Sequence, residues 1–230
     1  MPLIDVIIPA YNEEQSIGKV LAEIPAGLVR EVIVVDNNSS DQTGTVARAA
    51  GATVLREPRP GYGYACLAGM ARCYARPAAE QPEIIVFLDG DHSDYPEEMP
   101  LLLAPILRGE ADMVIGSRAL GEREAGSMMP QQIFGNWLAT NLLRRLYGAS
   151  FTDLGPFRAI RASALTRIGM QDTTYGWTVE MQLKAAKLKI PSTEVAVRYR
   201  RRIGTSKVSG TVRGTLGAGY KILWTIFRYL

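Results

Sequence analysis

Five short apolar runs, rich in valine and isoleucine, alternate with helix-compatible segments through the first half of the chain. The apolar runs lie at residues 3–9, 31–36, 52–56, 83–89 and 111–117. The segments between them lie at residues 15–24, 41–50, 62–76 and 96–109. This alternation predicts an α/β fold, with a mostly parallel central sheet and helices on both faces. With 230 residues, such a domain needs no disulfide or structural metal to bury a core.

The second half of the chain is less regular. We expect helices at 131–147, 175–188 and 211–229, and strands within 152–163 and at 190–200. The Gly- and Ser-containing, charged segment 121–130 predicts a loop. No repeat or low-complexity linker divides the chain, so we expect residues 1–210 to form one domain and residues 211–230 to form a terminal helix.

That terminal helix is amphipathic. One face carries large apolar side chains, and the other carries Lys221, Thr225 and Arg228. The apolar residues are Leu216, Tyr220, Leu223, Trp224 and Phe227. The pattern fits either a helix docked on the core of its own domain or a helix lying in a membrane interface, so contact with a membrane surface through 213–230 stays open.

The charge of the chain is unevenly distributed. After Glu194 no acidic residue follows, while eight basic residues do; the other 18 basic residues stand against 23 acidic ones. The body is therefore mildly acidic and the tail strongly basic, which favours a phosphate-bearing partner: a nucleic acid, an anionic membrane or a phosphorylated ligand.

The cysteines and the N-terminus point to a reducing compartment. Cys66 and Cys73 fall in one predicted helix, two turns apart, which is too far to bridge, and we interpret them as small buried apolar residues. The opening residues have neither a basic n-region nor a long apolar h-region, so we expect a cytoplasmic location.

Five acidic residues follow the apolar run 84–88. Asp94, Glu97 and Glu98 suit the N-terminus of a helix that begins at Pro96, with Ser93 or Asp94 as its cap. Asp89 and Asp91 precede that cap and repel each other, so another cause is needed. A divalent cation, Mg²⁺ or Mn²⁺, would remove the repulsion, because such ions prefer one or two carboxylates together with substrate phosphates.

Two further polar clusters, Asp36 and Ser117-Arg118, also follow predicted strands. Ligands of parallel sheets bind at the carboxyl ends of the strands, so the three clusters predict one site. A dinucleotide fingerprint is excluded, since Cys66 stands where its third glycine belongs, and the chain has no P-loop motif. Gly61 and Gly63 still allow a ligand to approach the backbone closely.

Seven motifs occur along the chain in an order and spacing similar to those of the inverting glycosyltransferase family 2. They are PAYNEE (9–14), VVDNNSSDQT (34–43), RPGYGYACLAG (59–69), FLDGD (87–91), GSR (116–118), DLGPFRA (153–159) and RRIGTSK (201–207). The chain most resembles the polyprenol-phosphate hexosyltransferase branch, the relatives of dolichol-phosphate mannose synthase. The resemblance implies the GT-A nucleotide-sugar fold.

The resemblance also implies roles for individual residues. The base and ribose of a UDP- or GDP-sugar would meet Pro9, Tyr11, Glu13 and Asp36. Asp89 would face the ribose or the metal, and Asp91 would coordinate the metal. Phosphate charge would be held by Arg118, Arg158, Arg201, Ser206 and Lys207. The chain departs from the family pattern at Ser93, where many relatives have a metal-binding Gln, and at Gly155-Pro156, where they have Ser-Gly.

The acceptor decides whether a general base is needed. A polyprenyl phosphate is already anionic near neutral pH, whereas a hydroxyl acceptor must lose a proton. Glu180 and Asp153 are the candidate bases, although Glu180 also fits a helix-surface partner for Lys184. His92, the one histidine, adjoins the metal motif, where it is either a ligand contact or a loop residue.

We therefore expect a metal-dependent hexosyltransferase that acts on a polyprenyl phosphate, on the inner face of a membrane or in the cytoplasm. A family 2 enzyme with a hydroxyl acceptor is the alternative. The basic tail also suits a nucleic-acid-binding protein, but no aromatic stacking platform accompanies its cations, so we expect no nucleic-acid partner.

Overall fold

The computed structural model describes residues 2–204 and 212–230, the first two of the latter by backbone alone. The strands are β1 (Ile4–Ala10), β2 (Glu31–Asp36), β3 (Thr53–Arg56), β4 (Ile84–Phe87), β5 (Met113–Ser117), β6 (Arg158–Arg161) and β7 (Ser192–Ala196). The helices are α1 (Ile17–Glu23), α2 (Thr43–Ala49), α3 (Tyr62–Tyr74), α4 (Met99–Leu107), α5 (Pro130–Tyr147), α6 (Ala162–Ile168), α7 (Trp177–Lys187) and α8 (Val212–Arg228). Two short 3₁₀ turns are η1 (Ala78–Glu80) and η2 (Pro96–Glu98).

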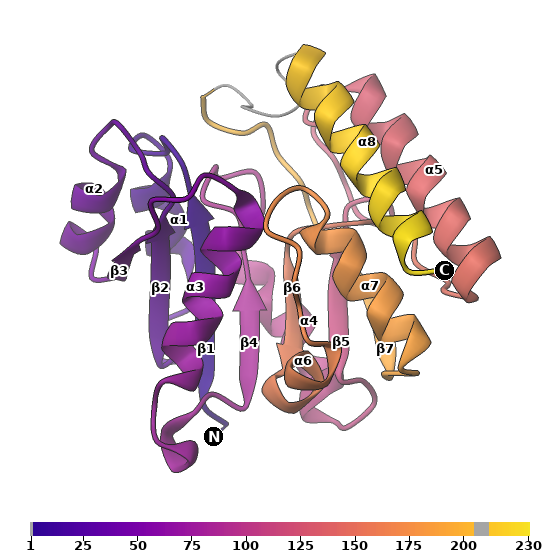
Figure 1. Ribbon diagram of the computed structural model, residues 1–230. Coiled ribbons are helices and arrows are strands. Elements are labelled where there is room, and N and C mark those ends of the chain that lie inside the picture. Colours follow the sequence, from indigo (N-terminus) through magenta and orange to yellow (C-terminus); the bar gives the residue numbers. More distant parts are fainter. Residues whose placement is uncertain (1, 205–211) are drawn as a thin grey trace.

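All seven strands form one sheet in the order β3-β2-β1-β4-β6-β5-β7 (Figure 1). Parallel pairing joins β3, β2, β1 and β4, and also joins β5 to β7. The exception is β6, which runs antiparallel between β4 and β5. The predicted mostly parallel sheet is therefore confirmed, and its carboxyl ends gather the predicted polar clusters on one edge.

Both faces of the sheet are covered, as predicted from the nearly continuous apolar strands. Side chains that alternate along each strand divide into two cores, because neighbouring residues of a strand point to opposite faces. Ile7 and Phe87 belong to the core beneath α3, α5, α6, α7 and α8. Ile8 and Val86 belong to the core beneath α1, α2 and α4. Cys66 and Cys73 are both free and buried in the first core.

The main element that the apolar pattern did not predict is α6. It follows β6 without a loop and ends at Gly169, which adopts the left-handed conformation with φ of 59°. Its seven residues are too few to give a clear helical periodicity, and we expected only a strand in this region. The predicted strand at 190–200 is shorter than expected, since the ladder of β7 ends at Ala196.

The last helix, α8, lies beside α5 (Figure 1). Its inner face joins the core through Ile226, and the Tyr147 hydroxyl donates to the Ile226 carbonyl. Its outer face leaves Tyr220 71% exposed and Phe227 54% exposed, and α5 leaves Phe134 62% exposed. The helix docks on its own domain, as the first interpretation expected, and it also presents a large apolar surface, while the membrane interface stays a prediction. No helix in the part of the chain that the structure describes is long and apolar enough to cross a membrane.

Candidate active site

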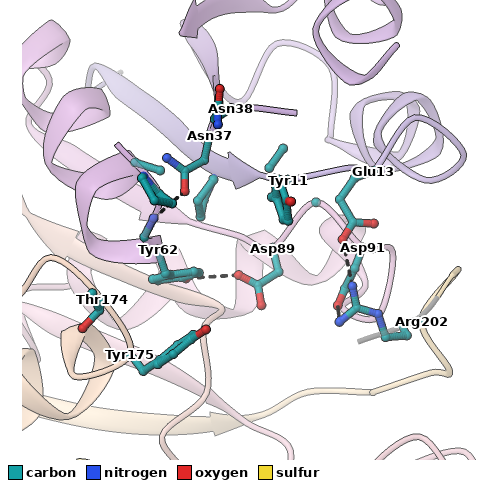
Figure 2. Close-up of a pocket in the computed structure, with 16 residues that line it drawn as sticks. Tyr11, Glu13, Asn37, Asn38, Tyr62, Asp89, Asp91, Thr174, Tyr175 and Arg202 are labelled. Atoms are coloured by element: carbon teal, nitrogen blue, oxygen red, sulfur yellow. Dashed lines mark hydrogen bonds and ion pairs between the residues drawn. The ribbon is translucent and has the colours of Figure 1, made fainter. Parts of the chain in front are cut away.

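A cavity of about 420 Å³ lies at the carboxyl ends of β1, β2 and β4 (Figure 2). Its walls come from motifs far apart in the sequence, which the parallel strands bring to one edge. They include Pro9, Tyr11, Glu13, Asn37, Asn38, Gly61, Tyr62, Asp89, Asp91, Thr174, Tyr175 and Arg202. We call this the donor-side cavity, after the role that we propose for it. Three residues predicted from the first motif, Pro9, Tyr11 and Glu13, therefore line it.

The acidic stretch after β4 enters this cavity with two carboxylates. Asp89 accepts a hydrogen bond from the Tyr62 hydroxyl at 3.1 Å. Burial and the nearby charge of Asp91 raise the pKa of Asp89 to about 7. Asp91 accepts hydrogen bonds from the amide and hydroxyl of Ser93, at 2.9 and 2.5 Å. Ser93, where relatives have Gln, thus fixes the orientation of Asp91.

Asp94 behaves differently from our expectation. A helical turn does begin at Pro96, but no side chain caps it, so the predicted cap is wrong. Asp94 is 2% exposed, and neither of its carboxylate oxygens has a hydrogen-bond partner among the residues that the structure describes. Burial, followed by the charges of Asp89 and Asp91, raises its pKa well above the ordinary range. The crowding of carboxylates predicted from the sequence therefore extends to a third buried group.

One of the basic residues that follow β7 lies beside the acidic side chains of the cavity. The Arg202 guanidinium lies 3.1 Å from Asp91 and 2.8 Å from Glu13 (Figure 2). The predicted Arg201 instead points to the 121–130 loop, where its Nε donates to the Ala125 carbonyl. Ser206 and Lys207, also predicted as ligands, lie outside the described residues.

The loop after β2 lines the cavity with the side-chain carboxamides of Asn37 and Asn38 rather than with the predicted Asp36. Asp36 accepts the amide N–H of Ser39 at 2.9 Å and does not line the cavity. Asn37 lines it, and its side chain donates to the carbonyls of Glu57 and Arg59 and accepts from the amide of Gly61. Asn37 therefore fixes the turn that opens α3.

The glycines of that turn approach another part of the protein. Gly61 has φ of 150°, which favours glycine, and it lines the cavity. A Cβ at Gly63 would collide with the backbone of Asp172 and Thr173. Gly63 thus allows a close approach, as expected, but to the segment 171–176 rather than to a ligand.

A second cavity, of about 330 Å³, adjoins the first. Both are lined by Tyr62, Asp89, Asp91, Tyr175 and Arg202. The second lies against α5 and α8, and we call it the acceptor-side cavity after the role that we propose for it. Its further walls include Arg118, Met128, Gln132, Asn136, Leu154, Pro156, Trp177, Tyr199, Ala218 and Ile222.

Arg118 is held in this cavity by Asp153. Its backbone amide, Nε and Nη2 donate to the two carboxylate oxygens at 2.7–2.8 Å. Burial would raise the pKa of Asp153, but Arg118 outweighs it and the pKa falls below its ordinary value. Asp153 is fully buried and lines neither cavity, so it is a structural partner of Arg118 rather than the candidate base we expected.

Two other predicted site residues are buried outside both cavities. The Arg158 guanidinium donates to the carbonyls of Leu154, Gly155 and Thr178, and burial lowers its pKa to about 10. Its position contradicts a role in holding phosphate. Glu180 is fully buried and pairs with Lys184 at 2.7 Å, as the i,i+4 interpretation expected, and it accepts two backbone amides as well.

His92 also lies outside both cavities. Its Nε2 is 2.9 Å from Glu23, which also pairs with Arg200. Burial would raise the pKa of Glu23, but its hydrogen bonds and ion pairs with Arg200 and His92 outweigh that effect and lower the pKa. His92 is thus a loop residue, the second of the two interpretations from the sequence.

The residues that line the cavities and were absent from our predictions include Asn37, Tyr62, Tyr175 and Arg202. Three of these four lie inside motifs that we identified, next to residues that we did predict. Motif matching finds the segment, but which of two adjacent side chains faces the cavity depends on backbone direction. Tyr175 belongs to no motif, and no sequence signal marks it.

Known proteins resemble this chain throughout its length. Residues 5–169 match the family model for glycosyl transferase family 2. An uncharacterised glycosyltransferase of Mycobacterium tuberculosis is 39% identical over 215 residues, which are 93% of each chain. An undecaprenyl-phosphate mannosyltransferase of Micrococcus luteus is 30% identical over 220 residues, covering 90% of this chain and 88% of that protein.

Among solved structures, the chain resembles a glucosyl-3-phosphoglycerate synthase of Mycobacterium tuberculosis in complex with Mn²⁺, UDP-glucose and phosphoglyceric acid. The TM-score is 0.77 at 25% identity, and the match covers 99% of this chain and 79% of that one. The motif order, the sheet and these likenesses agree. The chain has the GT-A fold and belongs to glycosyl transferase family 2, a family of enzymes, and it resembles the polyprenol-phosphate hexosyltransferase branch.

Proposed function

We propose that this glycosyltransferase moves a hexose from a UDP- or GDP-sugar to a polyprenyl phosphate, with Mg²⁺ or Mn²⁺ bound at Asp89 and Asp91. The observation that carries the proposal is the meeting of two cavities at one acidic centre. A transferase must bring the donor and the acceptor together at the reacting carbon. The shared walls, Asp89, Asp91 and Arg202, mark that meeting point.

The donor-side cavity suits a nucleotide. It combines aromatic surface from Tyr11 and Tyr62 with polar groups from Asn37 and Asn38. Such a mixture of apolar walls and a few placed polar groups is typical of cofactor-sized ligands. The related Mycobacterium tuberculosis structure, which carries UDP-glucose, supports this assignment.

The acidic centre fits a divalent cation. Asp91 and Asp94 are buried carboxylates and Asp89 is half-buried, and neither oxygen of Asp94 has a hydrogen-bond partner in the part of the chain that the structure describes. No group of three metal-binding side chains is assembled among residues 2–204 and 212–230, so the remaining ligands would be diphosphate oxygens and water. When bound, the cation would neutralise charge on the leaving diphosphate. The Mn²⁺ in the related structure supports this assignment.

The acceptor-side cavity suits a lipid phosphate. Arg118 and Arg202 supply positive charge, while Met128, Trp177 and Ile222 supply apolar walls. An anionic phosphate oxygen would attack the anomeric carbon as the bond from that carbon to the diphosphate oxygen breaks, and the configuration inverts. The two arginines hold the charge of the acceptor and of the leaving group.

The engagement of the two predicted bases by other groups also favours a phosphate acceptor. The two candidate bases, Glu180 and Asp153, line neither cavity, and both are engaged by other groups. A phosphate needs no strong base near neutral pH, whereas a hydroxyl acceptor does. The undecaprenyl-phosphate mannosyltransferase among the relatives supports the same acceptor class.

The outer faces of α5 and α8 suit a membrane interface, where such an acceptor resides. Phe134 and Trp137 of α5 and Tyr220 and Phe227 of α8 are all more than half exposed. Lys221 and Arg228 stack over Trp224, which places cations beside the aromatic surface. Aromatic and basic residues together favour the headgroup region of anionic membranes. We therefore propose peripheral attachment to the inner face of the membrane.

The test is a product assay. Purified protein is incubated with Mn²⁺ or Mg²⁺, a panel of UDP- and GDP-sugars, and either a short polyprenyl phosphate or 3-phosphoglycerate. Mass spectrometry then follows both the organic and the aqueous phase. A hexosyl-phosphoryl lipid formed with one donor is the expected product. A glycosylated phosphoglycerate, with no lipid product, would overturn the lipid acceptor and keep the enzyme class.

A further inference from the structure

The segment 171–176 connects α6 to α7 and forms part of the donor-side cavity. Thr174 and Tyr175 line that cavity (Figure 2). The Thr173 carbonyl accepts the amide N–H of Tyr64 at 3.0 Å, and the backbone of Asp172 lies directly on Gly63. The position of this segment therefore sets the width of the cavity at the start of α3.

Two buried carboxylates hold the segment in place. Glu180 accepts the amide of Gln171 at 3.1 Å and the amide of Asp172 at 2.7 Å. Asp172 accepts the amides of Thr174 and Gly176 at 2.8 and 3.2 Å. A carboxylate that accepts backbone N–H groups fixes a loop more firmly than a neutral acceptor would, because each hydrogen bond is charge-assisted.

Both carboxylates are in turn held by the C-terminal helix. Lys221 of α8 lies 2.9 Å from Asp172. The Tyr229 hydroxyl, just beyond the end of α8, donates to Glu180 at 2.9 Å. Burial and this hydrogen bond raise the pKa of Tyr229 to about 12, so it remains a donor at neutral pH. A Cβ at Gly176 would lie 2.5 Å from the Thr225 hydroxyl, so α8 also presses directly on the segment.

We propose that Glu180 and Asp172 are positioning residues, which make the geometry of the donor-side cavity depend on how α8 is seated. The contacts run from Lys221 and Tyr229 through the two carboxylates to the backbone of 171–173, and from there to Gly63 and Tyr64. Since α8 also carries the exposed apolar face, a surface that binds this face acts on the nucleotide site. The part that concerns nucleotide affinity rests on the proposed function.

The test uses two matched variants of α8, Lys221→Met and Arg228→Met. Both remove one cation that stacks over Trp224, at 4.5 and 4.8 Å, but only Lys221 pairs with Asp172. Hydrogen exchange is measured on the ligand-free protein for peptides that cover 61–66. We expect exchange there to quicken at least about threefold in Lys221→Met and to stay unchanged in Arg228→Met.

The second readout is the Kd of UDP or GDP with Mn²⁺, without acceptor. Lys221→Met and Tyr229→Phe are expected to weaken binding about threefold to tenfold, because each variant removes one charge-assisted interaction from the groups that position the segment. Their kcat at saturating donor should change by less than about twofold, which separates positioning from chemistry.

The outcomes distinguish the two proposals. Unchanged exchange at 61–66 in Lys221→Met would overturn the coupling, as would an equal effect in Arg228→Met. If the unmodified protein binds no nucleoside diphosphate, the proposed function fails, while the exchange comparison still decides whether α8 positions the segment.

Discussion

Two groups of carboxylates in and beside the site differ in their hydrogen-bond partners and in the direction of their pKa shifts. Asp153 receives three N–H groups from Arg118, and this pairing lowers its pKa. Asp94 receives none from residues 2–204 or 214–230, and Asp89 has a pKa raised to about 7 by burial and by Asp91. The first group is complete within the protein. In the second group the pKa values stay raised although Arg202 lies 3.1 Å from Asp91, which is typical of a group that serves a ligand rather than the fold.

Among the variants of the carboxylates Asp89, Asp91 and Asp94, the largest effect is expected for Asp91→Ala. We expect turnover to fall at least about 10³-fold, or about 4 kcal/mol of transition-state stabilisation, because the variant removes a carboxylate that we propose as a metal ligand. The thermal midpoint should not fall, since the change also relieves repulsion. Glu97→Ala is the matched control, because Glu97 follows in the same stretch but pairs with Arg198 at 3.3 Å, outside both cavities. Full activity in Asp91→Ala would refute the metal assignment.

Removing the charge of Asp153, which has a full set of partners, should instead lower the stability of the fold. Asp153→Asn leaves the buried Arg118 without its counter-charge, which costs about 3–5 kcal/mol of unfolding free energy near neutral pH. Because the pKa of Asp153 is lowered in the folded state, its contribution is present above its ordinary value of 3.8 and is lost as pH falls through the folded value. Urea unfolding should therefore show a gap between the variants that is constant above about pH 5 and narrows at lower pH. A gap that widens on acidification would contradict this.

Asp89→Asn sharpens the comparison, since we expect it to stabilise the metal-free protein. Burial and Asp91 raise the pKa of Asp89 from 3.8 to about 7, so the folded state loses stability as pH rises between these values. Asparagine removes this cost, and the gain should be about 2 kcal/mol larger at pH 8 than at pH 5. The measurement is urea unfolding with EDTA at both pH values, with turnover expected to fall. Equal gains at both pH values would show that Asp89 ionises without penalty.

The smallest effect is expected for Arg202→Gln. Its guanidinium also pairs with carboxylates, but the side chain is 26% exposed, so solvent screens the interaction. The unfolding free energy should change by less than about 1 kcal/mol, in contrast to Arg118→Gln, which removes a buried partner. Urea unfolding of the two variants side by side tests this. Equal losses of unfolding free energy in Arg202→Gln and Arg118→Gln would contradict the expected difference between a partly exposed and a buried ion pair.

The sequence predicted the sheet and its helices well, because continuous Val- and Ile-rich runs have few alternatives to buried parallel strands. It also placed Asp89 and Asp91 at the site, since strand ends converge at one edge, and the family resemblance added Glu13. It could not tell that Arg158 and Glu180 turn inward, because a buried charge satisfied by backbone groups looks in sequence like a charge that faces a ligand. It likewise favoured Arg201 over Arg202, a choice that depends on one residue of backbone direction.

The place of β6 in the sheet has a consequence for the order of assembly during synthesis. β4 and β5 are consecutive in the chain, yet β6 lies between them and β7 closes the far edge. In a nascent chain, the four strands β1, β2, β3 and β4 can form their part of the sheet as they emerge. β5 has no neighbouring strand to pair with until the residues of β6 have been made. Until then the edge of β4 is open, and the loops that carry Arg118 and Asp153 are unpaired. Strands β1 to β4 can thus pair on the ribosome before Thr174, Tyr175 and Arg202, which complete the wall of the donor-side cavity, have been made.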